Sequence, residues 1–112
     1  MRTFNVTTKD ELNPETLNQL RNKLSKNPIV TCETGYRRHL KLNTLMFTQI
    51  RHQFTNYDQL IRGVTLSNDE YISITNQVGD ILKIVLPNEI KNISNWVSIR
   101  NSKVNNRSYV KR

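Results

Sequence analysis

The chain has 112 residues with 36% hydrophobic residues, which is enough for one domain with a modest core rather than a disordered chain. Lys and Arg number 17 against 9 Asp and Glu, and this net charge of +8 favours a polyanionic partner, with nucleic acid as the first candidate. A charge excess that only keeps the protein soluble is the alternative that charge alone leaves open. The single cysteine, Cys32, excludes an intrachain disulfide framework and a cysteine-based zinc cluster and favours a reducing compartment.

Residues 1–28 are predicted to form an N-terminal arm followed by a short helix. Asn13 is a good helix cap and Pro14 suits the first helical position, so the helix should begin there and end near Ser25. Residues 1–11 show no sustained hydrophobic period and are expected to be a flexible arm.

Residues 29–86 are predicted to form an α+β domain, in which an antiparallel sheet of about four strands precedes a long amphipathic helix. A β-branched run and two stretches of alternating polarity, separated by an Asn43-Thr44 turn, indicate the first three strands. The fourth would lead directly into the helix. The four strands are expected at residues 29–32, 36–42, 45–54 and 60–66.

The long helix is the strongest local signal in the sequence. Ser67 stands three residues before Glu70, the spacing of a capping box, and Pro87 marks the end of the helix. Apolar residues at helical spacing form one stripe, which we expect to serve as the interface of a homodimer. These residues are Tyr71, Ile74, Val78, Ile81 and Val85.

Residues 87–112 are predicted to be a basic C-terminal extension, with a short helix through Trp96 and no order after Ile99. No run of about 18 apolar residues occurs, and the N-terminus lacks the apolar core of a secretory signal. We therefore expect an intracellular protein, located in the nucleus if the protein is eukaryotic or viral in a eukaryotic host and in the cytoplasm otherwise. Abundant asparagine is typical of an AT-rich genome, such as that of a virus or parasite.

Two motifs between Ile50 and Val85 resemble the positive cofactor four family of single-stranded-DNA-binding transcriptional coactivators. The first is Arg62-Gly63-Val64-Thr65-Leu66 with Glu70 and Tyr71 in the following helix, and the second is Ile50-Arg51 with Phe54. The resemblance implies a curved four-stranded sheet packed on the helix. It also implies dimerisation through the helices.

The same resemblance implies that Arg51 contacts a phosphate, Phe54 stacks on a base and Arg62 makes a second backbone contact. The sequence departs from the family where a hairpin ring and glycine are usual, because residues 40–45 offer only Lys41. It also lacks a lysine in the loop before Arg62. This departure would shift binding to other cations.

Catalysis is not expected, because the sequence has no Gly-rich phosphate loop and no H-E-x-x-H motif. His39 and His52 have no Cys or carboxylate at metal-ligand spacing, so no metal or other cofactor is predicted. Basic residues interleaved with aromatic ones on the expected strands instead suit single-strand binding, in which cations hold phosphates and rings stack on bases. The predicted nucleic-acid contacts are Arg37, Arg38, Lys41, Arg51, Phe54 and Arg62.

The sequence therefore favours a homodimeric protein that binds single-stranded DNA without sequence specificity and acts in transcription or replication, together with the proteins of those processes. Two alternatives stay open. One is a basic protein-interaction module, such as a viral inhibitor that grips an acidic partner, and the other is an RNA-binding protein.

Overall fold

The computed structural model describes residues 4–62 and 65–110, with side chains in the last helix up to Val104. Within these residues the chain is helical throughout, apart from the N-terminal segment and short connections. A single isolated β-bridge joins Thr8 to Thr55. The elements are α1 (Pro14–Ser25), α2 (Pro28–Thr31), α3 (Gly35–Gln53), α4 (Tyr57–Ile61), α5 (Asn68–Val85), a 3-10 turn η1 (Pro87–Glu89) and α6 (Ile90–Val110).

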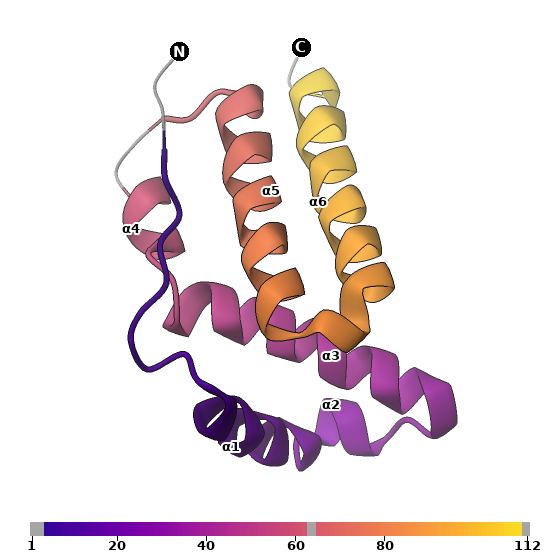
Figure 1. Cartoon of the computed structure of the whole chain (residues 1–112). Helices are drawn as coiled ribbons and strands as arrows, with labels where there is room; N and C mark the ends of the chain where they lie inside the picture. Colours follow the sequence, from indigo (N-terminus) through magenta and orange to yellow (C-terminus); the bar gives the residue numbers. More distant parts are fainter. Residues whose placement is uncertain (1–3, 63–64, 111–112) are drawn as a thin grey trace.

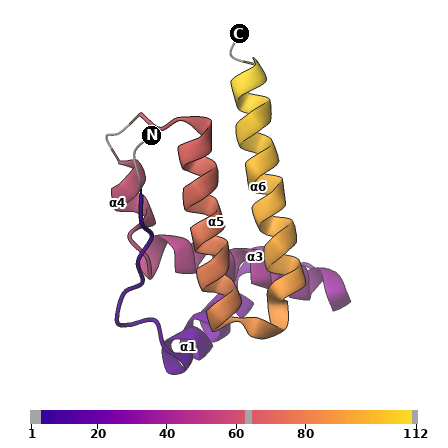
Figure 2. The same ribbon diagram turned by 45° about the horizontal axis from the view of Figure 1, so that its top comes forward.

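Helices α5 and α6 form an antiparallel hairpin that stands on α3 (Figures 1 and 2). Helices α1 and α2 cover the opposite side of α3, and the short α4 lies beside α5 (Figure 1). One core cluster draws side chains from residues 1–28, 29–86 and 87–112 alike, so the three predicted segments share a core. Its members include Leu20, Met46, Phe47, Ile50, Val78, Leu82, Ile93 and Trp96.

The two helix starts predicted from capping signals are confirmed. Asn13 accepts a hydrogen bond from the backbone N–H of Thr16, with Pro14 at the first position of α1. At α5 both halves of the capping box are present, since Ser67 accepts from the Glu70 N–H and the Glu70 carboxylate accepts from the Ser67 N–H. Local sequence chemistry therefore determines where these helices begin.

The predicted α+β class is wrong, because no β-strand occurs among the described residues and the expected second and third strands are one helix, α3. The supposed turn at Asn43-Thr44 lies in the middle of that helix. Thr44 Oγ1 donates to the Leu40 carbonyl at 3.0 Å, and Asn43 Nδ2 donates to Glu89 Oε2 at 2.8 Å. Both polar side chains are therefore accommodated by a helix, and the curved sheet that the family resemblance implied is not formed.

The hydrophobic period of α3 explains why it buries one face. Residues three and four apart lie on the same side of a helix, and the buried set follows that spacing. A strand would place half of this set on each face of a sheet. The buried set is Asn43, Met46, Phe47, Ile50, Arg51 and, at the C-cap, Phe54.

The other predicted strands are also wrong. The first expected strand is α2, where Asn27 accepts from the Ile29 N–H at 2.9 Å and Pro28 occupies the first helical position. Gly35 has φ +57, a left-handed conformation that lets the chain turn from α2 into α3. The fourth expected strand overlaps α4, and its residues Gly63 and Val64 lie outside the described residues.

The C-terminal extension also differs from the prediction, because α6 continues past Ile99 to Val110. This helix packs along α5 over several turns. The last predicted tail residues, Lys111 and Arg112, lie outside the part of the chain that the structure describes. The expected disordered tail is therefore, up to Val110, a structural helix.

Gly79 lies where α5 packs closely against α6. A Cβ atom added there would lie only 2.6 Å from Val97 Cγ2, and Val97 is β-branched and stiff. The absent side chain thus allows the two helices to pack at this distance.

We predict that Gly79→Ala lowers the free energy of unfolding by about 1 to 2 kcal/mol, although alanine has the higher helix propensity. Urea denaturation measures this change. The same substitution in a Val97→Ala background should be neutral or stabilising. If the loss persists in that background, the close contact with Val97 is not its cause.

Candidate anion-binding site

Arg51 lies on the buried side of α3 and is only 7% exposed. Its guanidinium carbon is 4.5 Å from the centre of the Tyr57 ring and 5.6 Å from that of Trp96. The Nε atom of Arg51 is buried and has no hydrogen-bond partner among the described residues. An arginine that the sequence placed on a strand surface is thus enclosed between α3, α4 and α6.

Arg100 approaches the same ring from α6. Its guanidinium carbon is 4.6 Å from the centre of Trp96, and its Nε is also buried without a described partner. Trp96 is 8% exposed and contacts Phe47 edge-on, with the ring centres 5.8 Å apart. Two guanidinium groups therefore lie against the buried ring of Trp96, and each makes a cation-π contact with it.

Burial lowers the pKa of both guanidinium groups below the usual arginine value, because desolvation disfavours the charged form. The neighbouring charge of Arg100 lowers the pKa of Arg51 further, while Tyr57 and Asp58 act in the opposite direction. Neither arginine forms a salt bridge with a carboxylate in the described part of the chain. The positive charges of these two side chains are therefore not neutralised by a directly bonded carboxylate among the described residues.

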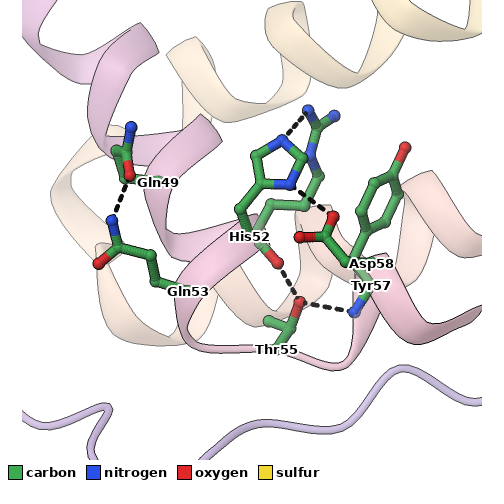
Figure 3. A network of polar contacts seen from close by, with 7 residues as sticks. Gln49, His52, Gln53, Thr55, Tyr57 and Asp58 are labelled. Carbon is green, nitrogen blue, oxygen red and sulfur yellow. Dashed lines mark hydrogen bonds and ion pairs between the residues drawn. The ribbon is translucent and has the colours of Figure 1, made fainter.

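His52 connects Arg51 to Asp58. One terminal nitrogen of Arg51 lies 3.0 Å from His52 Nε2, and His52 Nδ1 lies 2.6 Å from Asp58 Oδ1 (Figure 3). Since a guanidinium only donates, His52 Nε2 accepts, and the ring proton on Nδ1 is donated to Asp58. The carboxylate thus orients the imidazole, and the imidazole orients the guanidinium.

The turn that follows α3 is held by the hydroxyl of Thr55. It donates to the Arg51 carbonyl and accepts from the Tyr57 N–H at 3.2 Å (Figure 3). Tyr57 is thereby held against Arg51, and its ring also meets His52 edge-on with centres 5.7 Å apart. The cation is placed by a rigid local network rather than by a flexible loop.

A hollow of about 210 Å³ opens beside this cluster. Arg100 and Lys103 of α6 line one side, and Tyr57 and Tyr71 contribute aromatic rings from α4 and α5. A place that combines cations with rings can bind an anionic group and the planar group attached to it. We call this place, with Arg51 behind it, the arginine site.

The structure disperses the six predicted nucleic-acid contacts. Arg37 and Lys41 are exposed together near the start of α3, where they line a shallow hollow. Arg38 holds the turn between α2 and α3, because it donates to the carbonyls of Glu33 and Thr31 at 2.8 and 3.1 Å. Arg62 is exposed at the end of α4.

Phe54 lies in the core, where it is 8% exposed at the C-cap of α3. Its side chain is therefore packed within the protein rather than presented to a base. Arg51 lies one turn earlier on the same helix and faces the arginine site. The two residues predicted to share one nucleotide thus serve different parts of the structure.

The predicted dimer stripe on α5 is divided between core and surface. Ile74 and Val78 are fully buried within one chain, and Tyr71 lines the arginine site. Ile81 and Val85 instead line a second hollow together with Ile84, which is 78% exposed. Sequence reasoning missed Ile84.

Arg100 was also missed, because residues beyond Ile99 were expected to be disordered, and Lys103 was expected to contribute only as part of a disordered basic tail. The signal was present as helical spacing, since Trp96, Arg100 and Lys103 follow at steps of four and three. Extending the helical period past Trp96 would have placed both cations beside the ring.

Two further observations bound the chemistry of the site. Among the described residues, no group of three His, Cys, Asp or Glu side chains is arranged to hold a metal ion. Within the same residues, no helix combines the length and apolar character that crossing a bilayer requires.

Comparison with protein-family models, curated proteins and solved structures finds no match for this chain.

We predict that Phe54→Ala lowers the free energy of unfolding by about 3 to 5 kcal/mol, as expected for a buried phenylalanine. Chemical denaturation provides the measurement. Tyr36→Ala serves as the aromatic control, since Tyr36 is 67% exposed and should change stability by less than about 0.5 kcal/mol. Equal stability of the two variants would contradict the core position of Phe54.

Proposed function

We propose that this protein binds single-stranded nucleic acid without sequence specificity and holds the backbone phosphates at the arginine site. The observation that carries the proposal is the pair of guanidinium groups, Arg51 and Arg100, on the Trp96 ring. Neither has a carboxylate partner among the described residues. A bound anion would supply the missing negative charge.

Phosphate is the anion that this chemistry favours. Guanidinium groups donate paired hydrogen bonds to phosphate oxygens, and Lys103 adds a third positive charge at the same hollow. The net charge of +8 makes a polymer of phosphates a better partner than a single small anion.

A single strand suits the site better than a duplex. The rings of Tyr57 and Tyr71 line the hollow and can stack on unpaired bases, which a duplex keeps inside its own helix. Stacking on tyrosine does not select a base. The two tyrosine rings thus take the place of the sheet surface that was predicted to perform the same function.

We propose single-stranded DNA as the favoured ligand and RNA as the alternative. The protein would act inside the cell, in transcription or replication. The exposed thiol of Cys32 supports a reducing compartment. In a eukaryotic host, access to DNA would place the protein in the nucleus.

The first test compares oligonucleotide binding of the parent with that of the double variant Arg100→Gln/Lys103→Gln. Loss of two phosphate contacts should weaken affinity and reduce the slope of log affinity against log salt by about 1.4, or about 0.7 per charge. Fluorescence anisotropy over a range of salt concentrations measures both quantities.

The matched control is Arg21→Gln/Lys23→Gln, which removes the same charges from α1 at the other side of α3 (Figure 1). It should retain most of the slope. An equal loss in both variants would mean that only net charge matters and would reject the arginine site. Equal affinity for a duplex of the same length would reject the preference for single strands.

We also propose a homodimer, with its interface moved to the exposed end of the α5 stripe. Ile81, Ile84 and Val85 form an apolar hollow with Val6 and Leu12, and a second copy could cover the same patch by two-fold symmetry. Ile84→Asp should therefore give a monomer in sedimentation at tens of micromolar. The control Asn76→Asp, which keeps the acceptor oxygen for Asn101, should remain a dimer.

A further inference from the structure

Another hollow lies between α3 and α6. It differs from the apolar hollow at Ile81 and Ile84, and it adjoins the arginine site at Arg100. It encloses about 370 Å³. Leu40 and Phe47 of α3 and Ile99 of α6 form apolar walls, and Leu40 and Ile99 are 36% and 56% exposed. Large apolar side chains thus line an unfilled space in the described part of the chain.

Polar groups are interspersed in this groove. Asn92 and Asn95 of α6 and Thr44 of α3 line it together with the apolar residues. Asn92 is oriented by Glu89, whose Oε2 accepts from its Nδ2 at 2.8 Å. Apolar walls with a few oriented carboxamides are typical of sites for planar, hydrogen-bonding ligands, because asparagine can pair with the edge of a base.

The groove and the arginine site meet at Arg100 and Lys103, which line both hollows. A ligand in the groove would therefore place an attached anionic group beside these cations. The volume lies at the small end of the range for small-molecule pockets, about 300 to 1,000 Å³.

We propose that the groove between α3 and α6 binds the base of a nucleotide, while Arg100 and Lys103 hold its phosphate. The nucleotide can belong to the bound strand or be a free mononucleotide, and the two share this chemistry. The inference rests on the proposed function for the phosphate contact, but it adds a separate base site with its own walls.

Trp96 reports on the groove because it is the only tryptophan in the chain and lines this space. We expect adenosine monophosphate to change Trp96 fluorescence and to bind about tenfold more tightly than ribose 5-phosphate, which lacks the base. A strand with one abasic position per binding site should likewise bind more weakly than the intact strand.

The discriminating variant is Asn95→Phe, which places a ring into the groove from an exposed position on α6. It should abolish the advantage of the mononucleotide over ribose 5-phosphate and leave binding of the sugar phosphate unchanged. The control Ser94→Phe adds the same ring on the far side of α6 and should retain the advantage. Melting curves of both variants verify that the fold is intact.

The remaining outcomes separate failure of the base site from the choice between a strand and a free nucleotide. If strands bind but adenosine monophosphate and ribose 5-phosphate bind equally, the base site is wrong and the proposed function stands. If the mononucleotide binds but abasic and intact strands bind equally, the groove serves a free nucleotide only. If neither nucleotide nor strand binds and an acidic amphipathic peptide changes Trp96 fluorescence, both proposals fail.

Discussion

The contacts of the Trp96 ring are those on which the core and the candidate site both depend. The ring contacts Phe47 in a T-shaped arrangement in the core, and the guanidinium groups of Arg51 and Arg100 lie against it. Because α6 supplies the ring and α3 supplies Phe47 and Arg51, the site exists only when the hairpin of α5 and α6 stands on α3 (Figure 2). The close approach of Gly79 to the Val97 side chain lets α5 pack against α6, and Val97 directly follows Trp96 on that helix.

Burial of arginine without a bonded acid is energetically unfavourable, and its presence near an open hollow has a physical consequence. The cation-π contacts and the chain from Asp58 through His52 offset part of the cost of desolvation. Arg100 and Lys103 line the hollow beside this network, so an anion bound there would meet positive charge. Under the proposed function, an anion that binds only the folded chain would also stabilise it.

The errors in the sequence prediction share one cause, which α3 illustrates. Tyr36, Arg38, Leu40 and Leu42 alternate as a strand would, but the following residues Asn43, Met46, Phe47 and Ile50 have helical spacing. A short stretch of sequence can fit both the two-residue period of a strand and the 3.6-residue period of a helix. Which of the two forms depends on the length of the segment and on what its polar side chains contact. Asn43 was read as a turn because its partner, Glu89, is 46 positions away and invisible to local reasoning.

The sequence by itself determined the helix starts at Asn13 and Ser67, because a capping side chain bonds a backbone N–H only three residues away. It also determined the net charge and hence the expectation of a polyanionic partner. Only the tertiary structure decided which cations gather. Arg51 and Arg100 are 49 positions apart along the chain, and they meet at Trp96 because α3 and α6 cross there. The same packing leaves Arg37, Arg38 and Arg62 away from this ring. Burial, which no local pattern contains, placed Phe54 in the core and left Ile84 at the surface.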